Sequence, residues 1–188
     1  ATAYGWSPRF RADLVINNLA CWAKVTGEIL ILSDGTPWRP VVHVQDISSA
    51  FAAALAAPRE AIHNQAFNVG INTENYQVRD LAAIVQEAFP GCQVSYAEGG
   101  GPDPRSYRVD FSKIGRCVPA FKPTWNAQRG AEELCSAFGD IALTQEDFRG
   151  PKYVRLARLK ALLAEGKLDE KLYWKDRTYY PTSTDKEE

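Results

Sequence analysis

The chain has 188 residues, of which 45% are hydrophobic and 24% are charged, and its formal net charge is -1 at pH 7. These values are ordinary for a soluble globular protein, and the lack of a basic excess argues against a nucleic-acid or anionic-membrane surface. No apolar run approaches the roughly 18 residues of a membrane helix and no signal-peptide pattern is present, so we expect a cytoplasmic protein without a membrane partner.

The first predicted helix covers residues 10–26, where apolar side chains recur at helical spacing, and Gly27 is expected to end it. Residues 28–33 (EILILS) predict a short strand, and the SDGTPW stretch has the composition of a tight turn. The next segment, 39–44 (RPVVHV), is expected to be extended, because Pro40 disfavours helix at the residue before it.

An alanine-rich helix is predicted over 47–57, and we expect the Asp46 carboxylate to accept hydrogen bonds from its first-turn N–H groups. Asn126 is expected to cap a helix over 124–138, and Pro151 to lie in the first turn of a long helix over 151–169. The other predicted segments are a strand at 66–70, a connector at 71–78, a helix at 79–89, a strand at 92–97, a flexible loop at 98–104, an extended segment at 105–110, a short helix at 111–117 and a frayed tail at 182–188.

Helices and short strands alternate along the sequence, which predicts an α/β fold. The strands are too few for a full parallel sheet with both faces covered, so we expect a partial fold. The sequence contains no methionine and starts with Ala1. We interpret this as a fragment whose N-terminal portion is missing.

The sequence does not supply a catalytic apparatus or a metal site by itself. The glycines of EGGGPDP are followed by prolines, whereas a phosphate-binding loop leads into a helix N-terminus. Tyr4 is followed four residues later by Pro8, so it is not the Tyr-xxx-Lys pair of a dehydrogenase. Four cysteines without CxxC spacing predict buried free thiols, and two histidines are too few for a histidine-based metal site.

Two arginines are candidate anion ligands. Arg39 lies between a turn and a strand beside two prolines, where a guanidinium could bind a phosphate through two hydrogen bonds. The alternative is a surface ion pair with Asp34 or Asp46. Arg105 follows a glycine-rich loop and could reach a ligand, or it could be a solvated loop residue.

Several other polar and aromatic residues have two interpretations. Asn17 and Asn18 stand inside a predicted helix, so one amide could serve a ligand or a neighbouring loop, or both could simply be exposed. His43 is expected to orient Asp46 or a backbone carbonyl rather than transfer protons. Trp6 and Trp38 flank the candidate site and could stack on a base or sugar, or belong to the core or its rim.

Four motifs in order carry a family resemblance: YGWSPRFRADLVINNL, GEILILSDGTPWRPVVHVQDI, AFNVG and PDPRSYRVDFSKI. They resemble the C-terminal half of the extended short-chain dehydrogenase/reductases, the NAD-dependent epimerases and dehydratases acting on nucleotide sugars. The resemblance runs from residue 1 to about residue 138. It implies the C-terminal part of a Rossmann-type NAD(P)-binding fold plus a small α/β substrate-binding domain, with the N-terminal dinucleotide half missing.

The family's glycine-rich loop and Tyr-xxx-Lys pair would precede this segment, so no catalytic residue is expected in the chain. The resemblance places Asn18 and Arg39 at the diphosphate of a nucleotide sugar and Arg105 near a second phosphate-binding position. It places Ser7, Pro8 and Arg9 at the border of the nicotinamide and substrate cleft.

The resemblance further implies NAD as cofactor, bound mainly by the missing half, a nucleotide-sugar substrate and a homodimer. We expect residues 1–150 to form the sheet edge and substrate-binding part, and residues 151–188 a C-terminal helix and flexible tail. Two alternatives are a non-catalytic nucleotide-sugar binding module and a structural subunit that completes a partner's sheet.

Overall fold

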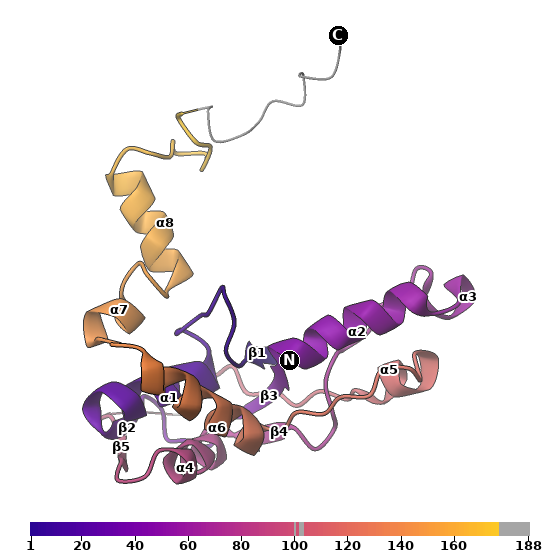
Figure 1. The fold of residues 1–188 in the computed structure, drawn as a ribbon, viewed down its shortest axis with the longest axis horizontal. Helices are drawn as coiled ribbons and strands as arrows, with labels where there is room; N and C mark the ends of the chain where they lie inside the picture. Colours follow the sequence, from indigo (N-terminus) through magenta and orange to yellow (C-terminus); the bar gives the residue numbers. More distant parts are fainter. Residues whose placement is uncertain (100, 102–103, 177–188) are drawn as a thin grey trace.

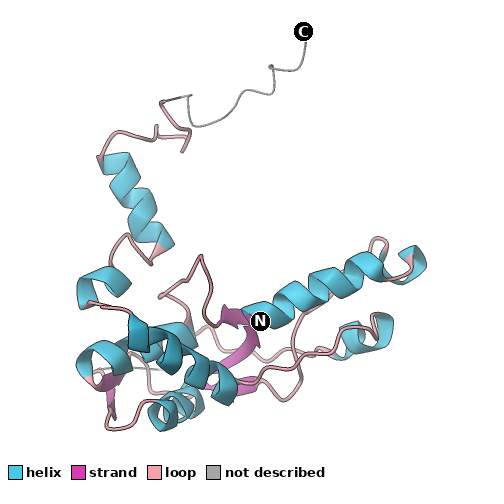
Figure 2. Cartoon of the chain, in the orientation of Figure 1, coloured by secondary structure: helices cyan, strands magenta, loops and turns pink. Residues whose placement is uncertain are grey.

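The computed structural model describes residues 1–99, 101 and 104–176, which form an α/β fold (Figures 1 and 2). The strands are β1 (Thr2–Tyr4), β2 (Glu28–Ile31), β3 (Trp38–His43), β4 (Asn75–Gln77) and β5 (Gln93–Tyr96). The helices are α1 (Val15–Thr26), α2 (Val44–Ala56), α3 (Arg59–Ile62), α4 (Val78–Ala88), α5 (Ser112–Cys117), α6 (Ala127–Ala137), the 3-10 turn η1 (Phe138–Asp140), α7 (Gln145–Arg149) and α8 (Arg155–Ala164). The predicted tail 182–188 and part of the predicted loop 98–104 lie outside the described residues.

The strands form two small sheets. In the first, β3 is central: β1 pairs with it in parallel, with Ala3 opposite Val42, and β4 pairs antiparallel, with Arg39 opposite Tyr76. In the second, β2 and β5 pair in parallel. Parallel neighbours need long crossover connections, so strands that are distant in sequence become adjacent and the two sheets interleave along the chain.

Helices α1, α4 and α6 pack against one another and bury the main core. Its central side chains include Ile16 of α1, Ile29 of β2, Leu81 of α4 and Leu134 of α6, each at most 1% exposed. A smaller cluster lies between α2 and α5 and contains Ala50, Ile114, Val118 and Phe121. Figure 1 shows α2 and α5 extending to one side of this core and α8 extending away from it.

The start of α2 differs from the prediction. The helix begins at Val44, and its N-cap is His43, whose Nδ1 accepts the N–H of Gln45 at 3.2 Å. The predicted cap, Asp46, is buried, and its two oxygens accept the N–H groups of Thr124 and Trp125 at 3.0 Å each. Asp46 therefore fixes the chain before α6 to α2. The predicted cap of α6 is confirmed, since the Asn126 side chain accepts from Arg129 N–H.

Other predicted boundaries were wrong for identifiable reasons. Helix α1 begins at Val15 because residues 5–12 form a loop tied down by Asn17. Residues 66–70 are not a strand, whereas β4 lies inside the predicted connector. In the predicted extended segment 105–110, the described backbone forms neither strand nor helix.

The C-terminal prediction of one long helix over 151–169 was also wrong. Helix α8 covers Arg155–Ala164, and Pro151 lies in the turn before it. The chain leaves the helix at Gly166, which has a left-handed φ of 69°. The unpredicted α7 begins with a capping box in which Thr144 and Asp147 bind each other's backbone N–H groups.

Candidate functional site

A cavity of about 600 Å³ lies where the start of α1, the end of β2, β3 and the segment around residue 105 meet. It brings together Asn18, Arg39 and Arg105, the three residues predicted to bind substrate, and we call it the Arg39 cavity. The other lining residues are Thr2, Asp13, Leu14, Val15, Leu19, Leu30, Ile31, Leu32, Ser33, Val78, Gly101 and Tyr107. Sequence proximity could not produce this grouping, because the three residues come from separate elements.

Arg39 is positioned by its strand and by a link to the other arginine. Its Nη1 donates to the carbonyl oxygen of Trp38 at 2.8 Å and to the carbonyl oxygen of Arg105. The side chain of Ser106 accepts the N–H of Trp38 at 3.0 Å, so a second contact joins the same two segments. Arg39 thus connects β3 to the segment carrying Arg105 and keeps both arginines at one wall.

The carboxylates considered as alternative partners of Arg39 bond to other groups. Asp34 accepts the N–H of Thr36 at 2.9 Å and its hydroxyl at 2.7 Å, which lowers the pKa of Asp34. Asp46 holds the backbone before α6, as described above. Asp34 therefore stabilises the turn at residues 34–36, and Asp46 stabilises the buried contact between α2 and the chain before α6.

The two asparagines of α1 have different roles. Asn17 is 2% exposed; its Oδ1 accepts the N–H of Gly5 at 3.0 Å and its Nδ2 donates to the carbonyl of Arg11 at 2.9 Å. It is the amide that serves a neighbouring loop. Asn18 lines the cavity, and its Nδ2 donates one hydrogen bond to the carbonyl of Ala12 at 2.9 Å.

The electrostatics of the Arg39 cavity favour an anion. The first turn of α1, including Val15 and Asn18, lines it, and this helix starts without a side-chain cap or an acidic residue in its first turn. Free N–H groups at a helix start attract negative charge. Among the described lining residues the carboxylate is that of Asp13; it accepts two bonds from Arg11 at 3.0 and 2.8 Å, which lower its pKa and offset its charge.

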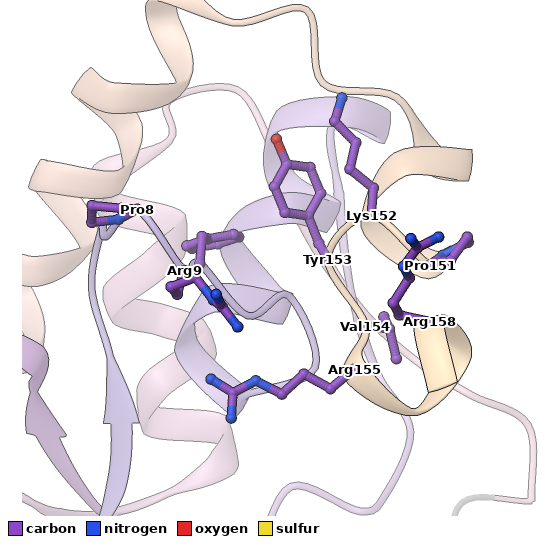
Figure 3. Close-up of a pocket in the computed structure, with 9 residues that line it drawn as sticks. Pro8, Arg9, Pro151, Lys152, Tyr153, Val154, Arg155 and Arg158 are labelled. Carbon is purple, nitrogen blue, oxygen red and sulfur yellow. The ribbon is translucent and has the colours of Figure 1, made fainter. Parts of the chain in front are cut away.

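The residues predicted to border the nicotinamide and substrate cleft, Ser7, Pro8 and Arg9, do not line the Arg39 cavity. Pro8 and Arg9 line a second cavity of about 550 Å³ together with residues from the start of α8 (Figure 3). Ser7 does not line either of these two cavities; its carbonyl oxygen accepts the N–H of Phe10 at 3.0 Å. Pro8 and Arg9 thus line a different cavity from Asn18, Arg39 and Arg105, and the placing of residues 7–9 at the border of a nicotinamide and substrate cleft stays a prediction.

His43 is a packing and capping residue, but with different partners from those expected. It is 1% exposed, and its Nε2 lies 2.9 Å from Oε2 of Glu133 in α6. Because Nδ1 accepts the Gln45 N–H, the ring proton is on Nε2 and donates to Glu133. The ring stacks on Trp125 with centroids 3.7 Å apart. The predicted contact with Asp46 or a backbone carbonyl was wrong. The actual partner, Glu133, is distant in sequence, so local sequence patterns could not identify it.

The aromatic residues near the chain start belong to the interior. Tyr4 is 2% exposed, and burial, followed by the charge of Glu74, raises its pKa above the ordinary value, which disfavours proton abstraction by its hydroxyl. Trp6 packs against Phe10 with ring centroids 5.3 Å apart. Trp38 instead carries the Arg108 guanidinium over its ring, 4.6 Å from the centroid. Neither tryptophan lines the Arg39 cavity.

Within residues 1–99, 101 and 104–176, no group of three or more His, Cys, Asp or Glu side chains could hold a metal ion. No helix of this part of the chain is long and apolar enough to cross a membrane.

The first part of the chain matches a known family of sequences. Residues 2–70 match the sequence model of the NAD dependent epimerase/dehydratase family. The matched residues include Asn18 and Arg39, and the predicted resemblance is confirmed.

Solved structures of such enzymes share the fold. UDP-glucuronic acid 4-epimerase from Bacillus cereus superposes with a TM-score of 0.60 at 21% identity, covering 73% of this chain and 43% of the epimerase chain. An NAD dependent NDP-hexosamine 5,6-dehydratase involved in tunicamycin biosynthesis gives 0.62 at 19% identity, covering 76% and 45%. ADP-L-glycero-D-manno-heptose-6-epimerase from Helicobacter pylori gives 0.60 at 17% identity, covering 74% and 42%.

These likenesses confirm the predicted Rossmann-type α/β fold class. The chain spans less than half the length of each of these structures, which agrees with the prediction of a partial fold.

Proposed function

We propose that this chain is the nucleotide-sugar-binding part of an NAD-dependent epimerase or dehydratase, and that the Arg39 cavity holds the nucleotide diphosphate. One observation carries this proposal: Asn18, Arg39 and Arg105, chosen from the sequence as diphosphate ligands, line a single cavity. The segment match to the family supports the substrate class.

The chemistry of the cavity suits such a ligand. Two guanidinium groups and the uncapped start of α1 offer positive charge and N–H donors to a diphosphate. Apolar side chains of α1 and β2 form other parts of the wall, and Tyr107 provides an aromatic ring for a base or sugar. A volume of about 600 Å³ lies within the range of about 300–1,000 Å³ found for small-molecule sites.

The residues present do not fit the dinucleotide itself. Among the described residues, no glycine-rich turn leads from a strand into a helix start, which is the arrangement that binds the pyrophosphate of NAD. The sequence also lacks a Tyr-xxx-Lys pair. We therefore assign NAD binding and the redox step to parts of the enzyme outside this chain and derive no step through the cofactor.

The division into residues 1–150 and 151–188 is also a proposal, supported by the way α8 stands away from the main core in Figure 1. A homodimer and a cytoplasmic location belong to the same proposal. Light scattering of the purified protein tests the dimer.

Calorimetry of the 188-residue chain with UDP tests the site, with uridine as the ligand that lacks the diphosphate. We expect UDP to bind and Arg39→Gln to weaken it about 10- to 100-fold, because hydrogen bonds to charged groups contribute about 1.5–3 kcal/mol. Arg116→Gln on α5, an equal charge change outside the cavity lining, is the control. Equal UDP affinity in the wild type and Arg39→Gln, or equal affinity for UDP and uridine, would contradict the proposal.

A further inference from the structure

The second cavity carries a concentration of positive charge that the proposed function does not use. It is lined by Pro8, Arg9, Phe10, Pro151, Lys152, Tyr153, Val154, Arg155 and Arg158, and we call it the Arg155 cavity. Four of these residues are cationic and none is acidic. Figure 3 shows the guanidinium groups of Arg9 and Arg155 extending into the space between the two chain segments.

The cavity has a fixed frame. The N–H of Ala12 donates to the carbonyl oxygen of Tyr153 at 3.2 Å, which ties the loop after β1 to the segment before α8. The rings of Phe10 and Tyr153 meet edge to face with centroids 5.7 Å apart. Phe10 is buried in the main core. The two walls are thus held together by backbone and core contacts, independently of the arginines.

Most of the cationic side chains of the Arg155 cavity form no ion pair with the described residues. Lys152 forms an ion pair with Asp147 at 2.9 Å. In the described part of the chain, Arg9, Arg155 and Arg158 have no carboxylate within the 4.0 Å of an ion pair. Asp13 lies close enough to feel the charge of Arg155, but its oxygens accept from Arg11. Three guanidinium groups therefore share one cavity without an ion pair among the described residues, although the charge of Arg158 also lowers the pKa of Glu165.

The start of α8 adds to this field. The helix has ten residues, its N-cap Val154 makes no side-chain capping bond, and its first turn has no acidic residue. Arg155 and Arg158 stand instead at this positive end of the helix, where cations are unfavourable. An anion in the cavity would offset both the helix end and the arginines.

We propose that the Arg155 cavity is a second anion site, which binds a compound carrying two adjacent phosphate groups. Three guanidinium groups that form no ion pair among the described residues match the charge of a diphosphate better than that of a single carboxylate. The apolar surfaces of Pro8, Pro151 and Tyr153 leave room for a ring attached to it. The site is distinct from the Arg39 cavity and does not depend on the proposed function.

The test is calorimetry with inorganic pyrophosphate on the 188-residue chain carrying Arg39→Gln, which weakens the first cavity. We expect this variant still to bind pyrophosphate, and the further double change Arg155→Gln/Arg158→Gln to weaken binding about 10- to 100-fold. Comparing the affinities for ADP and for pyrophosphate shows whether the site prefers a nucleotide or the free anion. Acetate, a single carboxylate, is expected not to bind.

The matched control is Arg59→Gln/Arg116→Gln on α3 and α5, which removes the same charge outside the cavity lining. It should leave pyrophosphate affinity within about twofold, since distant exposed charges are screened by salt. All the changed arginines except Arg39 are exposed, so folding is expected to persist, and circular dichroism checks it. Equal weakening in both double variants would overturn the site, as would loss of all pyrophosphate binding in Arg39→Gln alone. The latter result would leave the proposed function standing.

Discussion

The loop between β1 and α1 lines both cavities, and the buried amide of Asn17 bonds to it at two points, Gly5 and Arg11. Replacing Asn17 by Asp tests this role with almost no change in shape. An aspartate can still accept the N–H of Gly5, but once ionised it cannot donate to the carbonyl of Arg11. A protonated aspartate can make both bonds. We therefore expect Asn17→Asp to be tolerated at acidic pH and destabilising at neutral pH.

The magnitude follows from the two contacts and from burial. Losing the donor, which belongs to a side chain that is 2% exposed, leaves the carbonyl oxygen of the half-buried Arg11 without this partner, which costs about 1–3 kcal/mol. The new carboxyl should titrate above its ordinary pKa, because burial and the facing carbonyl disfavour its charged form. The folded state then holds the proton more tightly than the unfolded state, so stability falls as pH rises between the two pKa values. Each unit of separation corresponds to about 1.4 kcal/mol.

Urea unfolding of the wild type and Asn17→Asp at pH 4.5 and pH 8 measures this difference. We expect the variant to lose roughly 2–4 kcal/mol at pH 8 and less than about 1 kcal/mol at pH 4.5. Asn126→Asp is the matched control, because the exposed Asn126 side chain only accepts, from Arg129 N–H, and Asp is an equally good N-cap. A loss for Asn17→Asp that is equal at both pH values, or absent at pH 8, would refute the reasoning.

Two further predictions concern the core. Gly130→Ala should cost about 1–3 kcal/mol in urea unfolding, because an added Cβ would overlap the ring of Tyr4. Gly115→Ala, with nothing within 4 Å of the new Cβ, should be neutral or stabilise α5 by up to about 1 kcal/mol. A larger loss of stability for Gly115→Ala than for Gly130→Ala would contradict the packing. Burial raises the pKa of Cys21 to about 12, so iodoacetamide at pH 8 should modify Cys117, which is only half-buried, well before Cys21. Mass spectrometry of the native and urea-unfolded chain reads the order, and early modification of Cys21 would show that its environment is open.

Local sequence patterns predicted most of the secondary structure. The pattern of apolar residues located α1 and α4, the Asn126 cap marked the start of α6, and Gly27 ends α1 as expected. These features depend on neighbours within one or two turns, which the sequence displays directly. The strand 66–70 and the long C-terminal helix were wrong because short apolar runs fit several conformations until tertiary contacts select one.

The sequence alone determined the candidate ligands Asn18, Arg39 and Arg105 through motifs and local chemistry. Only the tertiary structure decided that these three line one cavity while Pro8 and Arg9 line another, because the crossover connections bring separate elements together. It also assigned the buried polar partners. Asp46 holds the chain before α6 instead of capping α2, because a buried carboxylate is stabilised by whichever N–H groups the fold places against it. Such pairings depend on long-range packing, which short-range sequence patterns do not encode.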